Sequence, residues 1–425
     1  MFKFQILKFW RGADEGVPDH SVDDRSMISP MLGQILRVAL AFVGVIVGAG
    51  FASGQEIMQY FVGFGLNGMW GVAIAAVVMS VMALIILQLG SYFRATEHGR
   101  VFDRIANPTF SRLLDLGVLI TLFSTGFVMF AGAGSNLNQQ WGWPVWVGAL
   151  IMVALVLAAG FLDVDKVTTV IGAITPFIIV FITVACLYVI FFVDRGPVDE
   201  LNAAALEVGS TMPHWSVAAV NYVGFNLMVA VSMAIVIGGS MFSPQVAGRG
   251  GLLGGLLLSA LIAVSAVTLF LAVETVGDDE LPMLTLINDV HPALGQVMAI
   301  AVYGMIFNTA LGMFYAFAKR LSVNRPERFR LWYFGSVGVG FLLSFFGFRN
   351  LVGYVYPILG YIGLLLIAIM LVAWVRERSR IAAESDRRLR LRDLWLAGRE
   401  DEFMAEVDAS NLDETQIRTA VRDGR

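Results

Sequence analysis

The chain has 425 residues, of which 57% are hydrophobic and 15% charged, and its mean hydropathy is +0.75. No soluble core needs that much apolar surface, so the composition excludes an ordinary soluble domain and indicates a polytopic membrane protein. The net charge of -4 at pH 7 gives no reason to expect a nucleic-acid partner. The single cysteine, Cys186, cannot form an intrachain disulfide, and we expect it to serve packing.

The chain opens with a segment, 1–32, that is not a membrane span. Its first part, Met1–Trp10, combines apolar residues with two lysines but lacks the length and the small-residue cleavage site of a signal peptide. We therefore expect a cytoplasmic N-terminal segment that lies on the membrane surface.

Hydrophobic runs long enough to cross about 30 Å of hydrocarbon follow from residue 35 to residue 375. They predict about ten membrane-spanning helices, at 35–63, 69–93, 113–134, 144–162, 167–193, 217–239, 250–274, 293–318, 331–347 and 351–375. The sixth run opens a second set of five. The sequence therefore predicts an all-α integral membrane protein with a ten-span core at 33–375, in a 5+5 plan with repeat one at 33–193 and repeat two at 217–375.

The first run is longer than one straight crossing requires, and it is interrupted at 47–56 by Val-Gly-Ala-Gly-Phe-Ala-Ser-Gly-Gln-Glu. The bilayer core offers no water to backbone groups, so this glycine-rich, polar stretch is tolerated only where protein or a wet cavity satisfies it. We expect a helix that breaks near Gly48 and aims free N–H and C=O groups at a small site. The segment is not a phosphate loop, because no Gly-Lys-Ser/Thr ending and no strand accompany it.

Glu56 follows the expected break by about two turns. Carboxylates inside a membrane are unfavourable unless they are hydrated, paired or protonated. Glu56 is therefore a candidate proton carrier or outer gate. The alternative is a water-facing carboxylate near the outer mouth.

No enzyme motif competes with a transport site. The four histidines are scattered without metal-ligand spacing, and one cysteine cannot build a metal cluster. We expect neither catalysis nor a cofactor. A transporter-like sensor that signals through the charged tail and a passive channel remain as alternatives, although a broken helix with central polar groups favours alternating access.

Lysine and arginine residues gather in the connections on one side of the predicted membrane. The connections after even-numbered spans carry Arg94, Arg100, Arg104, Arg112, Lys166, Arg249, Lys319, Arg320, Arg325, Arg328 and Arg330, whereas the opposite connections hold only Arg195 and Arg349. Basic loops stay in the cytoplasm, so we expect a multi-pass plasma (cytoplasmic) membrane protein with both termini cytoplasmic. Residues 376–425 then form a charged cytoplasmic tail, either solvated or regulatory.

The motif Gly-Ala-Gly-Phe-Ala-Ser-Gly-Gln-Glu, at 48–56 of a ten-span protein of this size, resembles the YkvI family of amino acid permeases. That family is a branch of the amino acid, polyamine and organocation transporter superfamily with the LeuT fold. The resemblance covers roughly 33–375. It implies an inverted repeat of five spans, with the first and sixth helices broken at the substrate.

By the same resemblance, the protein is a secondary active transporter that moves a small zwitterionic solute, such as an amino acid, by alternating access. A proton-coupled transporter of a related amine or carboxylate is the alternative. The expected partners are a small-molecule substrate and the lipid bilayer. The sequence does not specify the oligomeric state.

The resemblance also implies a sodium ion as coupling ion. The Val-Gly-Ala-Gly sequence at 47–50 matches the unwound segment of bacterial sodium-coupled amino acid transporters. In the eighth span, Thr309 fits the family's paired hydroxyl residues, whereas Asn308 departs from them, although an amide oxygen suits a hard cation. Alternatively, both residues hydrogen-bond neighbouring helices. The implied sodium ligands are the carbonyls of Gly44, Val47 and Met305 and the side chains of Asn308 and Thr309.

The substrate is expected between the two broken helices. Its carboxylate would meet the N–H groups where the first helix restarts, and its ammonium would meet carbonyls and an amide of the sixth span. The implied substrate residues are Gly48, Ala49, Gly50, Phe51 and Ser53 in the first span, Ser124 and Thr125 in the third, and Gly224, Phe225 and Asn226 in the sixth.

The arrangement of basic connections predicts the topology directly. Tags placed on both termini should be protected on the cytoplasmic side of intact cells, and a tag inserted within 197–210 should be accessible from outside. An externally accessible C-terminus would contradict the ten-span interpretation.

Overall fold

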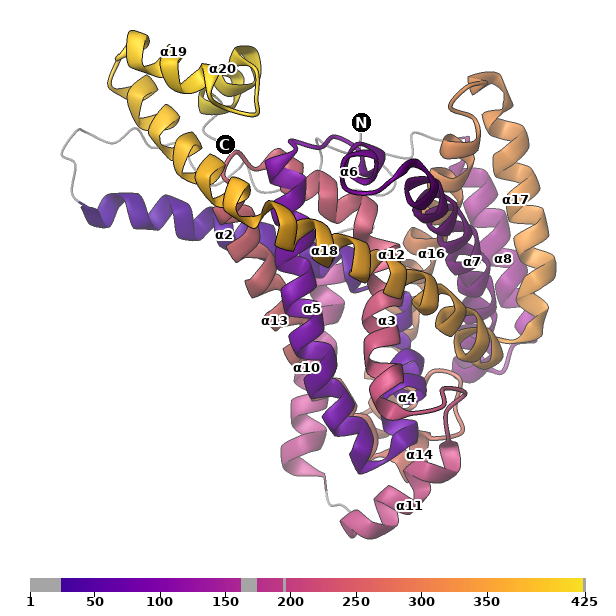
Figure 1. Cartoon of the computed structure of the whole chain (residues 1–425). Helices are drawn as coiled ribbons and strands as arrows, with labels where there is room; N and C mark the ends of the chain where they lie inside the picture. The colour runs from indigo at the N-terminus through magenta and orange to yellow at the C-terminus, as the bar shows by residue number, and fades with distance from the viewer. Residues whose placement is uncertain (1–23, 162–173, 194–195, 423–425) are drawn as a thin grey trace.

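The structure, a computed structural model, describes residues 24–161, 174–193 and 196–422, which form helices joined by short connections (Figure 1). The α-helices are α2 (Asp24–Ile46), α3 (Ala49–Ser53), α4 (Gln55–Tyr60), α5 (Leu66–Tyr92), α6 (His98–Ile105), α7 (Pro108–Trp141), α8 (Val145–Ala159), α10 (Ile174–Phe192), α11 (Val198–Val208), α12 (Trp215–Ser240), α13 (Pro244–Leu271), α14 (Val273–Val276), α15 (Pro282–Val290), α16 (Pro292–Leu321), α17 (Phe329–Leu343), α18 (Phe348–Leu396), α19 (Glu400–Asp408) and α20 (Glu414–Arg422). Three 3-10 turns, η3 (Val62–Phe64), η4 (Pro326–Arg328) and η5 (Ser344–Phe346), link some of them.

The described helices agree with the expected spans. Eight of them are long and apolar enough to cross a membrane, and two shorter apolar helices, Met31–Ile46 and Val145–Ala159, supply the remaining crossings. The prediction of an all-α, ten-span membrane protein is therefore confirmed. The expected surface segment Met1–Trp10 and the start of the fifth span, 167–173, lie outside the described residues.

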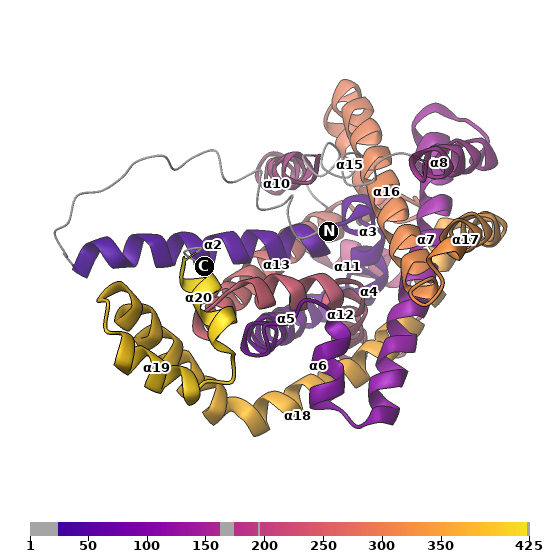
Figure 2. The ribbon, with the colours of Figure 1, turned by 90° about the horizontal axis from the view of Figure 1, so that it is seen from above.

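The spans assemble into two groups that each draw equally on the two halves of the chain. A bundle contains the first two spans of each half, α2 with α5 and α12 with α13, which pack closely on one another. A scaffold contains the third and fourth spans of each half, α7 with α8 and α16 with α17. Figure 2 shows the scaffold on one side of the molecule and the bundle at its centre, with α2 running across it. Equivalent use of both halves is what a 5+5 repeat predicts.

The first span is broken, as the sequence predicts. Helix α2 ends at Ile46, and α3 begins at Ala49, with Gly48 in an extended conformation between them. A second interruption follows at Gly54, whose φ of 81° lies in the left-handed region that favours glycine. The span therefore crosses the membrane as three helical pieces.

The sixth span is not broken, and this part of the prediction is wrong. Helix α12 runs without interruption from Trp215 to Ser240. Its Gly224 instead serves close packing, because a Cβ added there would stand 2.6 Å from the carbonyl oxygen of Gly360 on α18. The Gly224 carbonyl in turn lies against Gly363. Small residues on both helices thus let the two backbones touch.

Helix α18 carries the irregularity that the prediction assigned to α12. Pro357 lies inside this helix and cannot donate to the carbonyl of Gly353, one turn earlier. The Thr211 hydroxyl donates to that carbonyl instead. The Asn221 amide of α12 donates to the Pro357 carbonyl at 3.0 Å. Side chains from other segments therefore satisfy the backbone around the proline.

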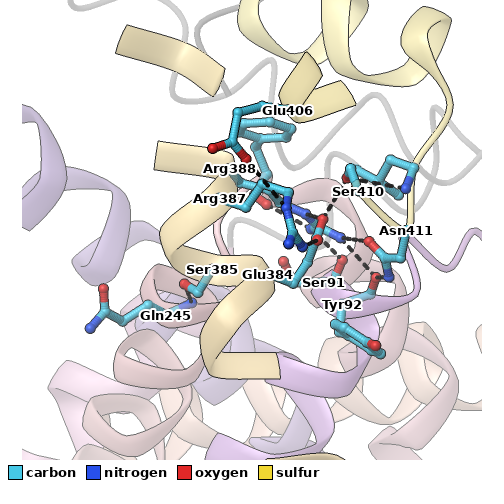
Figure 3. A network of polar contacts seen from close by, with 12 residues as sticks. Ser91, Tyr92, Gln245, Glu384, Ser385, Arg387, Arg388, Glu406, Ser410 and Asn411 are labelled. Atoms are coloured by element: carbon cyan, nitrogen blue, oxygen red, sulfur yellow. Dashed lines mark hydrogen bonds and ion pairs between the residues drawn. The ribbon is translucent and has the colours of Figure 1, made fainter. Parts of the chain in front are cut away.

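Helix α18 continues past residue 375, the expected end of the membrane core, and joins the tail without a break. The tail packs on the molecule through Arg388, whose side chain is fully buried (Figure 3). The guanidinium donates to the carbonyls of Ser91 at 3.0 Å and Tyr92 at 2.9 Å, at the end of α5, and to that of Phe242 at 2.8 Å. A cation is favourable at the end of a helix, where carbonyls lack partners.

The remaining donors of the same guanidinium bind within the tail. Arg388 donates to the Glu384 carboxylate at 2.9 Å and to the side-chain oxygen of Asn411 at 2.8 Å. All five guanidinium donors are therefore used. Helices α19 and α20 add a small apolar core with this part of α18, formed by Phe242, Leu391, Phe403, Val407, Leu412, Ile417, Ala420 and Val421.

The buried position of Arg388 predicts a weakened tail when it is neutralised. Arg388→Gln removes the buried ion pair with Glu384 and the guanidinium hydrogen bonds to three carbonyls, so the free energy for opening the tail should fall by about 3–5 kcal/mol. Amide hydrogen exchange in α19 and α20 should become much faster. Arg380→Gln, in the same helix but with an exposed side chain, is the matched control. Equal exchange in both variants would contradict the role given to Arg388.

Candidate functional site

The break in the first span is shaped by local polar contacts. The Ser53 hydroxyl donates to the Gly50 carbonyl at 2.7 Å and accepts from the N–H of Gln55 at 3.2 Å. It thereby joins the end of α3 to the start of α4 across Gly54. Ser53 was predicted to bind substrate, and in this structure its hydroxyl supports the turn.

Unpaired backbone groups remain at the first interruption. The last bond at the end of α2 joins the Val47 N–H to the Val43 carbonyl at 2.9 Å, and the first of α3 joins the Ala52 N–H to the Gly48 carbonyl at 3.1 Å. The carbonyls of 44–47 and the N–H groups of 49–51 therefore lack partners within these helices. This is the pair of electronegative and electropositive ends that the sequence predicts.

The scaffold helix α16 faces this interruption. The hydroxyl oxygen of Thr309 lies 3.7 Å from the position that a Cβ would take on Gly48. Asn308 and Thr309 are half-buried, and Met305 is buried one turn earlier. Among the described residues, the side chains of Asn308 and Thr309 make no hydrogen bond to a neighbouring helix. Both remain open to a ligand.

Not all of the expected sodium ligands lie near one another in the structure. Val47 is buried beside the interruption, whereas Gly44 is exposed, and no atom lies within 4 Å of the position of its Cβ. Gly48 and Thr309 thus meet, while Gly44 lies apart on α2. The assignment of a carbonyl ligand to Gly44 stays a prediction.

Glu56 turns back onto α3. Its side chain is 5% exposed, and a Cβ on Gly50 would lie 1.6 Å from its Oε1 atom, so the carboxyl group rests on the backbone of Gly50. Only a glycine leaves room for this contact. No hydrogen bond or ion pair joins Glu56 to another described side chain. The alternative of a water-facing carboxylate is therefore not what the structure shows.

Three tyrosines surround this carboxyl group, and the sequence analysis did not single them out. Tyr60 of α4, Tyr222 of α12 and Tyr356 of α18 are fully buried and close enough to Glu56 for electrostatic interaction. The rings of Tyr60 and Tyr222 meet edge to face at 5.3 Å. The Tyr60 hydroxyl donates to the Asn221 side chain at 3.2 Å. The only signal for them in the sequence is that each is a tyrosine, with a polar hydroxyl group, within or next to an apolar span.

Two hydroxyl groups near the middle of the protein have no partner. The Thr125 hydroxyl of α7 and the Tyr356 hydroxyl of α18 are buried without a hydrogen bond in the described part of the chain. Ser124, beside Thr125, is buried as well. Buried polar groups are normally paired, so each unpaired hydroxyl is a candidate contact for a bound molecule.

The sixth-span residues have other roles. The Phe225 ring stacks on that of Tyr356, with centroids 4.0 Å apart. The Asn226 amide donates to the Tyr222 carbonyl of its own helix at 2.9 Å. Together with Gly224, which packs on α18, these residues offer no free backbone carbonyl to an ammonium group, whereas the side-chain oxygen of Asn226 as an added acceptor stays a prediction. Their assignment as ammonium ligands through backbone carbonyls is therefore wrong, because α12 is an intact helix.

No family model matches the chain. The chain is 25% identical over 342 residues to the uncharacterized membrane protein YkvI of Bacillus subtilis, which covers 80% of this chain and 96% of that protein. It is 22% identical over 351 residues to the uncharacterized protein YyaD of the same organism, which covers 79% of this chain and 96% of that protein.

Two solved transporter structures share the fold. The inward-facing structure of Mhp1 matches with a TM-score of 0.56 at 18% identity, covering 81% of this chain and 76% of that one. Mhp1 is a nucleobase-cation-symport-1 family transporter. MhsT in complex with L-phenylalanine matches with a TM-score of 0.54 at 16% identity, covering 82% and 91%.

These likenesses define the class of protein: an all-helical membrane protein with the LeuT-like fold, as expected. The resemblance to the YkvI family is confirmed as well, over nearly the whole length of the two Bacillus subtilis relatives.

The two glycines Gly224 and Gly50 should respond differently to substitution. Gly224→Ala drives a methyl group into the backbone of α18, and this overpacking should lower the free energy of unfolding by about 1–3 kcal/mol. The melting temperature should therefore fall. Gly50→Ala meets only the end of the flexible Glu56 side chain, so the fold should persist while transport is lost. Gly312→Ala, where no atom lies within 4 Å, is the control for both. Normal transport by Gly50→Ala would remove this glycine from the site.

Proposed function

We propose that the protein is a secondary active transporter that moves a small zwitterionic solute, such as an amino acid, by alternating access coupled to sodium. The observation that carries this proposal is the broken first span, whose unpaired backbone groups lie beside α16 and beneath a buried carboxyl group. A bundle that packs against a separate scaffold around such a break suits alternating access. The site lies in the plasma membrane, with both termini cytoplasmic.

The sodium part of the proposal is supported by the meeting of α3 and α16. The carbonyls that end α2 and the Thr309 hydroxyl are hard oxygen ligands of the kind that alkali cations prefer. Asn308 and Thr309 are not engaged with neighbouring helices among the described residues, which favours ligand binding over the packing alternative. The L-phenylalanine bound to MhsT supports a small zwitterionic solute in this fold.

A proton-coupled transporter is the second candidate, and Glu56 is the observation that favours it. This carboxyl group is buried without a hydrogen-bond partner in the described part of the chain. A buried carboxylate of this kind is unfavourable unless it is paired or protonated. Glu56 is therefore able to exchange a proton during the transport cycle.

Uptake into proteoliposomes separates the two candidates when a sodium gradient and a pH gradient are imposed in turn. Sodium coupling predicts uptake driven by sodium alone, and Thr309→Ala should weaken the affinities for sodium and solute together, because the two are linked. Thr183→Ala, whose hydroxyl bonds its own helix, is the control. The coupling ion would be a proton if the pH gradient alone drives uptake, if Thr309→Ala leaves that uptake unchanged, and if Glu56→Gln makes it independent of pH.

A further inference from the structure

Glu56 is the one buried charged side chain of the described membrane region that lacks a partner. The other fully or nearly buried charged groups, Glu384 and Arg388, belong to the tail and pair with each other at 2.9 Å. Asp115, two turns into α7, pairs with Arg320. An uncompensated buried carboxyl group at a helix break is therefore a site for something that carries positive charge or a proton.

The position of Glu56 also decides which part of a solute can approach α3. Its Oε1 atom rests on the backbone of Gly50, within the segment whose N–H groups were expected to bind a carboxylate. In the ionised state of Glu56, which a bound cation would stabilise, a second carboxylate beside it would be repelled. An ammonium group meets no such obstacle. The intact α12 offers no free backbone carbonyls for it, whereas Glu56 is a buried acceptor that carries negative charge when ionised.

The surroundings of Glu56 suit a cation as well. The rings of Tyr60 and Tyr222 form an edge-to-face pair beside it, and Tyr356 stacks on Phe225. Aromatic faces attract ammonium groups. The buried Tyr356 hydroxyl lacks a partner and is free to accept a hydrogen bond from the ammonium N–H.

We propose that Glu56 binds the ammonium group of the solute, with the Tyr356 hydroxyl as a second acceptor, and that the substrate class is a small organic amine. The ammonium group is required, and a carboxylate on the solute is dispensable. This inference rests on the proposed function for the location of the site. It widens the solute class from zwitterions to any small molecule with that ammonium group.

The proposal includes a proton exchange that balances charge. In the empty site the Glu56 carboxyl holds a proton, and when the ammonium binds, that proton leaves to solution and the carboxylate pairs with the cation. The titratable groups that interact with Glu56 are the phenols of Tyr60 on its own helix, Tyr222 on α12 and Tyr356 on α18. None of them carries positive charge, so the substrate supplies it.

Matched ligands test the proposal on the purified full-length protein. The probes are leucine, 3-methylbutylamine and 4-methylpentanoate, with the corresponding sets derived from alanine and phenylalanine. A ligand of the native state raises the melting temperature. At least one amine should raise it, along with its parent amino acid, and each deaminated acid should not. The proposal is overturned if no amine stabilises the protein, or if an acid does so as well as its amine.

Variants assign the effect to Glu56. Glu56→Gln keeps the shape of the side chain and should weaken amine binding about a hundredfold or more, since one partner of a buried charge pair is removed. Tyr356→Phe should weaken it less. Glu207→Gln, on the exposed α11, is the control and should bind normally. Amine binding should release a proton in weakly buffered solution with the wild-type protein but not with Glu56→Gln. Unchanged affinity in Glu56→Gln would also overturn the proposal.

The outcomes for this proposal and for the transport function are separable. Amine binding that depends on Glu56, without flux into proteoliposomes, would leave the proposal standing and remove the transporter. Flux of an amino acid that does not depend on Glu56, with no binding of amines, would support the transport function and overturn the ammonium site at Glu56.

Discussion

Backbone N–H and C=O groups inside a lipid bilayer must find partners within the protein, because hydrocarbon offers none. Between Ile46 and Ala49 the first span does not meet that requirement within its own helices, and the rest of the site is arranged around this break. Ser53 and Gly54 hold the short α3 in place, α16 brings Thr309 to the gap, and Glu56 lies over Gly50. The backbone N–H and C=O groups that remain unpaired at the break are the ones available to bind a ligand.

Glycine has two different uses in the bundle, and the sequence does not distinguish them. At Gly54 it permits a left-handed turn, and at Gly50 it leaves room for the Glu56 carboxyl group. At Gly224 and Gly363 it permits two intact helices to touch. Both patterns combine glycine with nearby polar residues. The break in the first span was predicted correctly because its hydrophobic run is too long for one straight helix. The break in the sixth span was predicted wrongly because the length of its run gives no such signal.

The spans, the 5+5 plan and the broken first helix could be predicted, since hydropathy and glycine spacing are local properties of the sequence. The tyrosines around Glu56 could not be predicted. Tyr60, Tyr222 and Tyr356 come from three helices that are far apart in the chain, and their meeting depends on how α12 packs on α18. The burial of Arg388 was also hidden, because its charge-rich surroundings in the sequence are typical of a solvated helix.

We propose that the solute and its coupling ion bind together at the break in the first span, where Thr309 of α16 meets Gly48. The most direct measurement is ligand protection of a cysteine introduced by Thr309→Cys, since the native Cys186 is buried and should not react. A solute that raises the melting temperature of this variant should slow its modification by a charged thiol reagent several-fold. Modification of a Gly312→Cys variant, one turn along α16, should be unaffected. Equal modification rates at position 309 with and without that solute would contradict the account.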